Sequence, residues 1–413
     1  MKTTITKTIT TFCLLVSSIF VISASTTNSI QCTLKGEVID RPQSSQLLLV
    51  KQGEDLRSAN VVNIPINDGI FEYILNCDHE EQYELIFSEE HERGAWRPVP
   101  FFSENGIINF TLYPIDQFDK NMVTGGKLNR KYWEEYRNKV VSVSKAVENA
   151  YNEYVDDNYR EILNEHGVLE KDFQEKLKVL NKNGIDISSA LKEISGSTFQ
   201  ELSIWQFQYI KENPSIVGYS ILLSTAGSLV QRNRHFQETN DISPYAELYQ
   251  TVYAPKFPDH PYTEKMENLF AGASIKAGVP FVDFIAVGLD GEPVKLSERI
   301  AGKPTVLNLW ASWCGPCRKK GKELIPVYEE FRDKGFVVIG VARERSISHA
   351  ETAVQLDKYP WENLVELNDA EKIWEKYGIG NAGGMVFLID EDGLIVATNP
   401  SIEEIKNFLL KNL

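Results

Sequence analysis

The sequence predicts a multidomain protein, with a small all-β N-terminal domain, an α-helical middle region and a C-terminal α/β domain. Three observations support this. The 413 residues exceed the roughly 250 to 300 at which a single hydrophobic core stops growing. The spacing of apolar residues changes twice along the chain, which indicates three kinds of structure in succession. Finally, 42% hydrophobic and 24% charged residues are typical of a globular protein.

Composition also limits the partners that the protein can take. The formal net charge of -15 argues against nucleic acid, which is bound through clustered Lys and Arg side chains. The acidic balance favours solubility instead. His166, His235 and His260 have no second ligand three or four residues away, so the sequence predicts no metal site. We expect no cofactor.

Residues 1–25 have the features of a cleaved export signal. Lysines precede an apolar run over residues 12–22, small residues follow, and cleavage is expected after Ala24 or Ser25. A membrane anchor is the alternative, but the run is shorter than the roughly 20 residues that span a bilayer. We therefore expect an exported protein without a membrane span.

Export places cysteines where disulfides persist. Of the five cysteines, Cys13 would leave with the signal. Cys314 and Cys317 are separated by two residues and form the natural redox pair. Cys32 and Cys77 then remain for a structural disulfide across the first domain. Two buried free thiols are the alternative, because cysteine also packs well as a small apolar residue.

Residues 26–115 are expected to form the all-β domain, as a small sandwich or barrel. Short apolar runs alternate there with turns that contain Gly, Asn, Asp and Pro, which is the pattern of consecutive strands. Nothing in this pattern suggests an active site. The expected strands cover residues 34–39, 46–51, 69–75, 83–87 and 107–113.

Residues 116–273 change to helical spacing. Apolar side chains recur at alternating steps of three and four from Trp133 to Tyr154, which places one stripe on a long helix. The stripe could line a ligand groove, but we favour packing against a neighbour. A Pro-rich stretch over residues 254–261 should be a surface connection to the last domain. Further helices are expected over residues 170–180, 198–211 and 215–231.

Residues 274–413 alternate strands with helices, as in an α/β sheet that is covered on both faces. An Asp290-Gly291 turn joins two early strands. An apolar strand over residues 305–310 then runs directly into the cysteine pair and a helix. Later strands are expected over residues 336–342, 385–390 and 394–398, and later helices over residues 369–377 and 402–411.

The sequence Cys314-Gly315-Pro316-Cys317 at the start of a helix suits reversible disulfide exchange. Cysteines at this spacing close a small loop whose bond can open and close repeatedly. The helix N-terminus favours an anion, so Cys314 should ionise more readily than an ordinary cysteine and attack as the thiolate. Cys317, one turn further in, should be shielded and resolve the intermediate. Pro316 fixes the first turn, and Gly315 lets a partner's backbone approach.

A structural zinc site is the alternative for two such cysteines. It would require a second pair of cysteines at this spacing, or a histidine at ligand spacing, and the sequence has neither beside the motif. The succession of strand, motif and helix therefore favours the redox interpretation.

The run from Leu307 to Arg318, Leu-Asn-Leu-Trp-Ala-Ser-Trp-Cys-Gly-Pro-Cys-Arg, resembles the active-site signature of the thioredoxin superfamily. Within it, the chain is most similar to TlpA-like envelope disulfide reductases related to cytochrome c maturation thioredoxins. Residues 278–299 resemble the extra hairpin before the core of those proteins, and residues 387–393 resemble their later hairpin. The resemblance implies a thioredoxin-like fold for residues 274–413, preceded by domains of no assigned function.

The sequence departs from that family near the cysteines. The slot of the family's cis-proline, which faces the cysteines and presents a backbone edge to the substrate, holds Gly384. A carboxylate three residues after the second cysteine is replaced by Lys320, and the buried aspartate of cytosolic thioredoxins by Asn308. We expect Gly384 to loosen substrate alignment, so that Gly384→Pro would gain rate. Lys320 and its neighbours should add positive charge beside the sulfurs, so that Lys320→Glu would lower the reduction potential.

The resemblance implies a thiol-disulfide oxidoreductase in which Cys314 attacks, Cys317 resolves and Trp313 stands beside them. Expected partners are protein or small-molecule disulfides and an upstream electron donor of the periplasm or cell envelope, such as a membrane protein. One alternative is a thioredoxin-fold module that binds partners without turnover. Another is a peroxide-reducing redoxin. Its peroxidatic cysteine follows a threonine by three positions, but here Ala311 lies three positions before Cys314, which disfavours this alternative.

Overall fold

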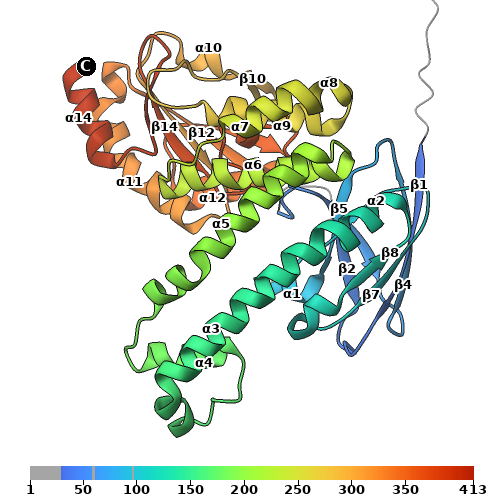
Figure 1. Ribbon diagram of the computed structural model, residues 1–413. Coiled ribbons are helices and arrows are strands. Elements are labelled where there is room, and N and C mark those ends of the chain that lie inside the picture. The colour runs from blue at the N-terminus through green and yellow to red at the C-terminus, as the bar shows by residue number, and fades with distance from the viewer. Residues whose placement is uncertain (1–28, 58–60, 95–96) are drawn as a thin grey trace, which may run out of the picture.

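The computed structural model describes residues 29–57, 61–94 and 97–413. The expected export signal, residues 1–25, lies outside the described residues. Strands come first, helices fill the middle, and strands alternate with helices at the end (Figure 1), which is the order that the sequence predicted. Within the part of the chain that the structure describes, no helix combines the length and the apolar character needed to cross a membrane.

The N-terminal part is a sandwich of two four-stranded sheets, with strand orders β4-β1-β7-β8 and β3-β2-β5-β6. Alternate residues of each strand point toward the facing sheet, so Leu34, Leu49, Leu85 and Phe110 share one core with almost no exposure. The strands are β1 (Ile30–Val38), β2 (Gln46–Lys51), β3 (Val62–Pro65), β4 (Ile70–Cys77), β5 (Gln82–Phe87), β6 (Val99–Phe102), β7 (Gly106–Leu112) and β8 (Met122–Thr124), with helix α1 (Ser88–Glu92) after β5.

The structure corrects the expected disulfide between Cys32 and Cys77, because both are free thiols. They lie on the neighbouring strands β1 and β4, but the register pairs Cys32 with Leu75 and Cys77 with Ile30. Such diagonal neighbours are about 7 to 8 Å apart, whereas a disulfide requires Cβ atoms about 4 Å apart. Burial raises the pKa of the Cys32 thiol to about 11.

We expect iodoacetamide to modify Cys77 but not Cys32 in the folded, oxidised protein near neutral pH. Cys32 is fully buried and its raised pKa keeps the thiol protonated, whereas Cys77 is partly exposed. Intact-mass analysis without reductant, before and after unfolding, measures both cysteines. If neither cysteine takes up label after unfolding, the disulfide forms after all.

The middle part is helical, and α3 and α5 lie against each other as they extend away from the rest of the molecule, with α4 packed on α3 (Figure 1). Trp133 packs into the sandwich core and Tyr136 into the core of the helices, which supports packing as the role of the aromatic stripe. The Pro-rich stretch expected as a surface connection contains α8. The helices are α2 (Lys127–Arg130), α3 (Asn138–Glu165), α4 (Phe173–Lys182), α5 (Ser188–Glu212), α6 (Ile216–Phe236), α7 (Ser243–Leu248), α8 (Ala254–Lys256) and α9 (Pro261–Ala273).

The C-terminal part is a seven-stranded sheet of order β10-β9-β13-β12-β11-β14-β15. β11 runs parallel to β12 and antiparallel to β14. Leu307 and Leu309 of β11 face one core, and Val306 and Trp310 face the other, as in a sheet buried on both faces. The elements are β9 (Ile285–Gly288), β10 (Pro293–Lys295), α10 (Leu296–Ile300), β11 (Thr305–Trp310), α11 (Gly315–Phe331), β12 (Val337–Glu344), α12 (Ile347–Asp357), β13 (Glu362–Leu367), α13 (Ile373–Lys376), β14 (Met385–Ile389), β15 (Ile395–Thr398) and α14 (Ile402–Asn412).

The sequence predicted neither the short helix α10 nor the longer elements α12 and β13. The buried residues of α12 are Ala350, Ala353 and Asp357, and the larger Ile347 and Val354 are only partly buried, so the apolar stripe of this helix is weak in the sequence. β13 contains Glu366, which has 1% exposure. A charged residue in a buried strand hides the apolar run by which such strands are found.

Glu366 makes the stability of the protein depend on pH. Burial raises its pKa to about 7, and within the described part of the chain its Oε2 atom has no hydrogen-bond partner. In the unfolded chain the Glu366 carboxyl has a pKa of about 4.3 and loses its proton more easily. The free energy of unfolding therefore falls as the pH rises from about 4.3 to the pKa of the folded protein.

We therefore expect Glu366→Gln to raise the melting temperature, and to raise it more at about pH 8 than at about pH 5. The amide keeps an acceptor for the Glu371 N–H, which now bonds Oε1 at 2.8 Å. Thermal unfolding of both proteins across this range measures the difference. Equal shifts at all pH values would assign the effect to packing instead.

Candidate active site

Strand β11 and helix α11 position the two cysteines. Cys314 is the N-cap of α11 with an extended backbone, and its sulfur accepts a hydrogen bond from the Cys317 N–H at 3.3 Å. Pro316 lies in the first turn, where its missing N–H leaves no bond unmade. The structure joins Cys314 and Cys317 by a disulfide, with Cα atoms 5.3 Å apart. The predicted pair is therefore together at the N-terminus of a helix.

The two cysteines differ in their surroundings. Both are partly exposed. Cys317 also packs against the core that contains Trp310 and Leu324. That environment is the one expected for a resolving cysteine, while Cys314 lies at the end of the helix.

Three cations that follow the motif, Arg318, Lys320 and Lys322, lie close to acceptors. Arg318 pairs with both oxygens of the buried Asp357, at 2.6 and 2.9 Å, and Lys322 lies 3.7 Å from the same carboxylate. Lys320 donates to the Pro400 carbonyl at 2.6 Å, and burial lowers its pKa. Each of these groups therefore has an acceptor, and the effect of Lys320 on the reduction potential stays a prediction.

The loop before β14 approaches the disulfide through Gly383, not through Gly384 as expected. A Cβ on Gly383 would lie 2.5 Å from the sulfur of Cys314, whereas a Cβ on Gly384 would lie 1.9 Å from the Leu309 carbonyl oxygen. The described residues contain no cis peptide bond. Gly384 is thus packed against the backbone of β11, and the sequence alignment was wrong about which glycine faces the cysteines.

A buried carboxylate beside the motif was missed by the sequence analysis. Glu344 ends β12 with 2% exposure, and its Oε1 atom accepts a hydrogen bond from the Ser312 N–H at 2.6 Å. Its other oxygen lies 3.8 Å from Nδ1 of His349. The sequence did contain a sign of this contact, because Glu344 comes just after one predicted strand and the motif just after another. The carboxyl ends of parallel strands meet at one edge of a sheet.

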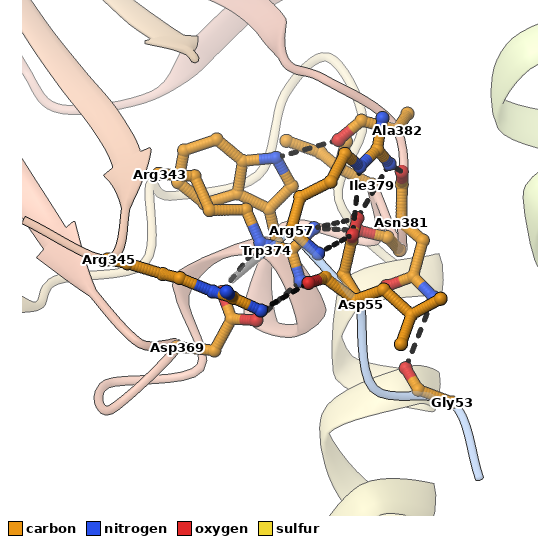
Figure 2. A network of polar contacts seen from close by, with 12 residues as sticks. Gly53, Asp55, Arg57, Arg343, Arg345, Asp369, Trp374, Ile379, Asn381 and Ala382 are labelled. Atoms are coloured by element: carbon orange, nitrogen blue, oxygen red, sulfur yellow. Dashed lines mark hydrogen bonds and ion pairs between the residues drawn. The ribbon is translucent and has the colours of Figure 1, made fainter. Parts of the chain in front are cut away.

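A loop of the N-terminal sandwich, residues 52–57, also reaches the site; we call it the sandwich loop (Figure 2). The Arg57 guanidinium lies 3.8 Å from the centre of the Trp313 ring and donates to the Asn381 carbonyl at 2.9 Å. Asp55 holds the same guanidinium at 2.7 and 2.8 Å. Asn381 in turn donates to the Gly53 carbonyl at 3.2 Å. A domain to which the sequence assigned no site thus contacts the residue next to Cys314.

Two arginines of the C-terminal part hold the sandwich loop (Figure 2). Arg343 lies 3.4 Å from Asp55 and pairs with both oxygens of Asp369 at 2.6 Å, and Arg345 donates to the Leu56 carbonyl. Burial alone would raise the pKa of Asp55, but hydrogen bonds from Arg57 and the charge of Arg343 outweigh it and lower the pKa. Asp55 is therefore ionised at neutral pH.

The chain matches the AhpC/TSA family over residues 277–398. It is 30% identical over 151 residues to the thiol-disulfide oxidoreductase ResA of Bacillus cereus, a match that covers 36% of this chain and 75% of the relative. The protein belongs to the thioredoxin superfamily of thiol-disulfide oxidoreductases. ResA of Halalkalibacterium halodurans is 30% identical over 132 residues, which cover 31% of this oxidoreductase and 72% of the relative. The crystal structure of the thioredoxin domain of a Bacteroides vulgatus thiol-disulfide oxidoreductase is 28% identical, covers 34% of this chain and 99% of that one, and has a TM-score of 0.31.

In this thiol-disulfide oxidoreductase we expect Gly384→Pro to lose stability instead of gaining rate. Any Cβ at this position overlaps the carbonyl of Leu309, a backbone group of a central strand that cannot move aside. The free energy of unfolding should fall by about 1 to 3 kcal/mol. Gly315→Ala is the control, because an added Cβ there meets no described atom within 4 Å. Denaturant unfolding measures the stability of both variants. A Gly384→Pro protein that is as stable as wild type and reduces disulfides faster would show that position 384 faces the cysteines.

Proposed function

We propose that the protein is an exported disulfide reductase or exchange enzyme of the periplasm or cell envelope that works through Cys314-Gly-Pro-Cys317. The observation that carries the proposal is the placement of Cys314 at the N-terminus of α11, with its sulfur 3.3 Å from the Cys317 N–H. A backbone donor and the positive end of the helix dipole both stabilise a thiolate at that sulfur.

In the proposed reaction the reduced enzyme donates two electrons to a substrate disulfide. The Cys314 thiolate attacks one substrate sulfur, and the other leaves as a thiolate. Cys317 loses its proton and attacks the sulfur of Cys314, which releases the second substrate thiol and closes the Cys314–Cys317 disulfide. A dithiol donor then restores the reduced pair. Protein or small-molecule disulfides are the proposed substrates, and an envelope redox partner, such as a membrane protein, is the proposed donor.

Glu344 and Gly383 prepare the site for this exchange. The hydrogen bond from the Ser312 N–H to Glu344 holds the turn that carries Trp313 and Cys314. Gly383 has no side chain, and this lets the loop before β14 lie directly against the sulfur of Cys314. The sulfur of Cys314 therefore lies between the turn that Glu344 holds and the loop at Gly383, whose backbone carries no side chain there.

Export is proposed from residues 1–25, whose lysines, apolar run and small residues match a cleaved signal. An oxidising compartment would supply the disulfides on which such an enzyme acts.

Three variants test the chemistry. We expect Cys314→Ser to reduce insulin with a dithiol donor only at the background rate, because the attacking sulfur is gone. Cys317→Ser should accumulate a mixed disulfide with the substrate, visible on a non-reducing gel, because the resolving sulfur is gone. Cys32→Ser, far from the motif, is the matched control and should keep full activity. In the reduced wild-type protein Cys314 should be alkylated faster than Cys317.

The outcomes separate the candidate functions. Equal alkylation of the two cysteines would contradict their assigned roles. A wild-type protein that binds partners but does not accelerate insulin reduction would be a thioredoxin-fold binding module without turnover.

A further inference from the structure

A cavity of about 750 Å³ lies where the sandwich, the helices and the thioredoxin-like part meet. Its volume is within the roughly 300 to 1,000 Å³ of pockets that bind ligands. The sandwich loop and β5 form one wall, α6 and α9 form the second, and the segment from Asn368 to Asn381 forms most of the third. The thioredoxin-like part alone would have no such cavity.

The lining combines apolar side chains with charges of both signs. Leu223, Leu269 and Trp374 supply apolar surface. Lys265, which donates to the Gln52 carbonyl at 3.0 Å, lies in the same lining as Glu84, whose burial raises its pKa to about 7. A lining of this kind suits a stretch of polypeptide, which brings apolar, polar and backbone groups together. It suits a simple anion or a purely apolar molecule less well.

The cavity borders the loop that touches the attacking sulfur. Gly380 and Asn381 line the cavity, and Gly383 lies against Cys314. Figure 2 shows Asn381 beside Arg57 and Gly53 of the sandwich loop, to which it is hydrogen-bonded. Two residues of extended chain span at most about 7 Å, so residues that flank a cysteine bound at Cys314 can reach the cavity. A small disulfide has no such continuation, whereas a polypeptide does.

We propose that this cavity binds the polypeptide segment next to the disulfide of a protein substrate. The inference rests on the proposed function and adds a role for the first two parts of the chain. The sandwich and the helices form two of the three walls, so they select among substrates that the cysteine pair alone would treat alike.

Gly227 on α6 offers a way to fill the cavity. It belongs to the lining, and a Cβ added there meets no described atom within 4 Å outside its own helix. The Cβ of Gly227→Phe therefore has room at this position of the lining, and the ring attached to it takes up space in the cavity. Gly196 on α5 is equally open and lies outside the lining, so Gly196→Phe is the matched control. Ser228→Phe, at the adjacent lining position, repeats the test.

The full-length variants are compared in steady-state reduction of two probes with one dithiol donor. The first probe is an unstructured peptide with one internal disulfide and flanking residues on both sides, and the second is dithiobis(nitrobenzoate). We expect Gly227→Phe and Ser228→Phe to raise KM for the peptide about tenfold with little change in kcat. Both should reduce the small disulfide at the wild-type rate, and Gly196→Phe should match wild type on both probes.

An unchanged KM for the peptide in the cavity variants overturns the inference. An equal loss with both probes also overturns it, because the effect would then lie at Cys314 itself. A melting temperature shows whether Gly227→Phe folds, and if it does not, Ser228→Phe decides. A wild-type protein that reduces neither probe overturns the proposed function, and the inference with it, whereas the other failures leave the proposed function standing.

Discussion

A buried contact between Arg343 and Asp55 links the N-terminal sandwich directly to the thioredoxin-like part. Both side chains are almost fully buried, with 5% and 4% exposure, and Arg343 is shared with Asp369 on the same side of the sheet. Each charge also has a second partner, because Arg343 pairs with Asp369 and Asp55 pairs with Arg57, so the buried network is compensated on both sides of the interface. The sandwich loop is therefore held against the thioredoxin-like part, and Arg57 is carried onto Trp313. Arg343 also lines the cavity between the three parts.

This arrangement divides the work of the enzyme between its parts. The thioredoxin-like part supplies the chemistry: the helix N-terminus at Cys314, the packing of Cys317 and the loop at Gly383. The earlier parts supply surroundings that a lone domain of this fold lacks. The Arg57 guanidinium lies over the ring of Trp313, next to Cys314, and Asp55 balances its charge. The sandwich loop therefore adds shape to the site without adding a large net charge.

Electrostatics around the cysteines follow from where acceptors lie, and not from which charges are close in sequence. Arg318 and Lys322 share Asp357, a residue of α12, which the sequence did not predict as a helix. Glu344 reaches the motif from the end of β12 and binds the Ser312 N–H. A carboxylate thus stands beside the motif although the family's usual positions for one hold other residues. The first pairing depends on how α11 and α12 pack beside each other, and the second on the parallel strands β11 and β12, whose carboxyl ends meet at one edge of the sheet.

Local patterns in the sequence were enough to predict the order of strands, helices and strands with helices, and the redox pair at Cys314 and Cys317. These features are local: apolar periodicity, turn residues and a short motif are all readable within one window of the chain. Tertiary structure alone decided that Cys32 and Cys77 are out of register, that Gly383 faces the sulfur, and that Arg57 lies on Trp313. Each depends on how separate segments are aligned by packing, and a shift of one or two residues between strands changes which side chains meet without changing any local pattern.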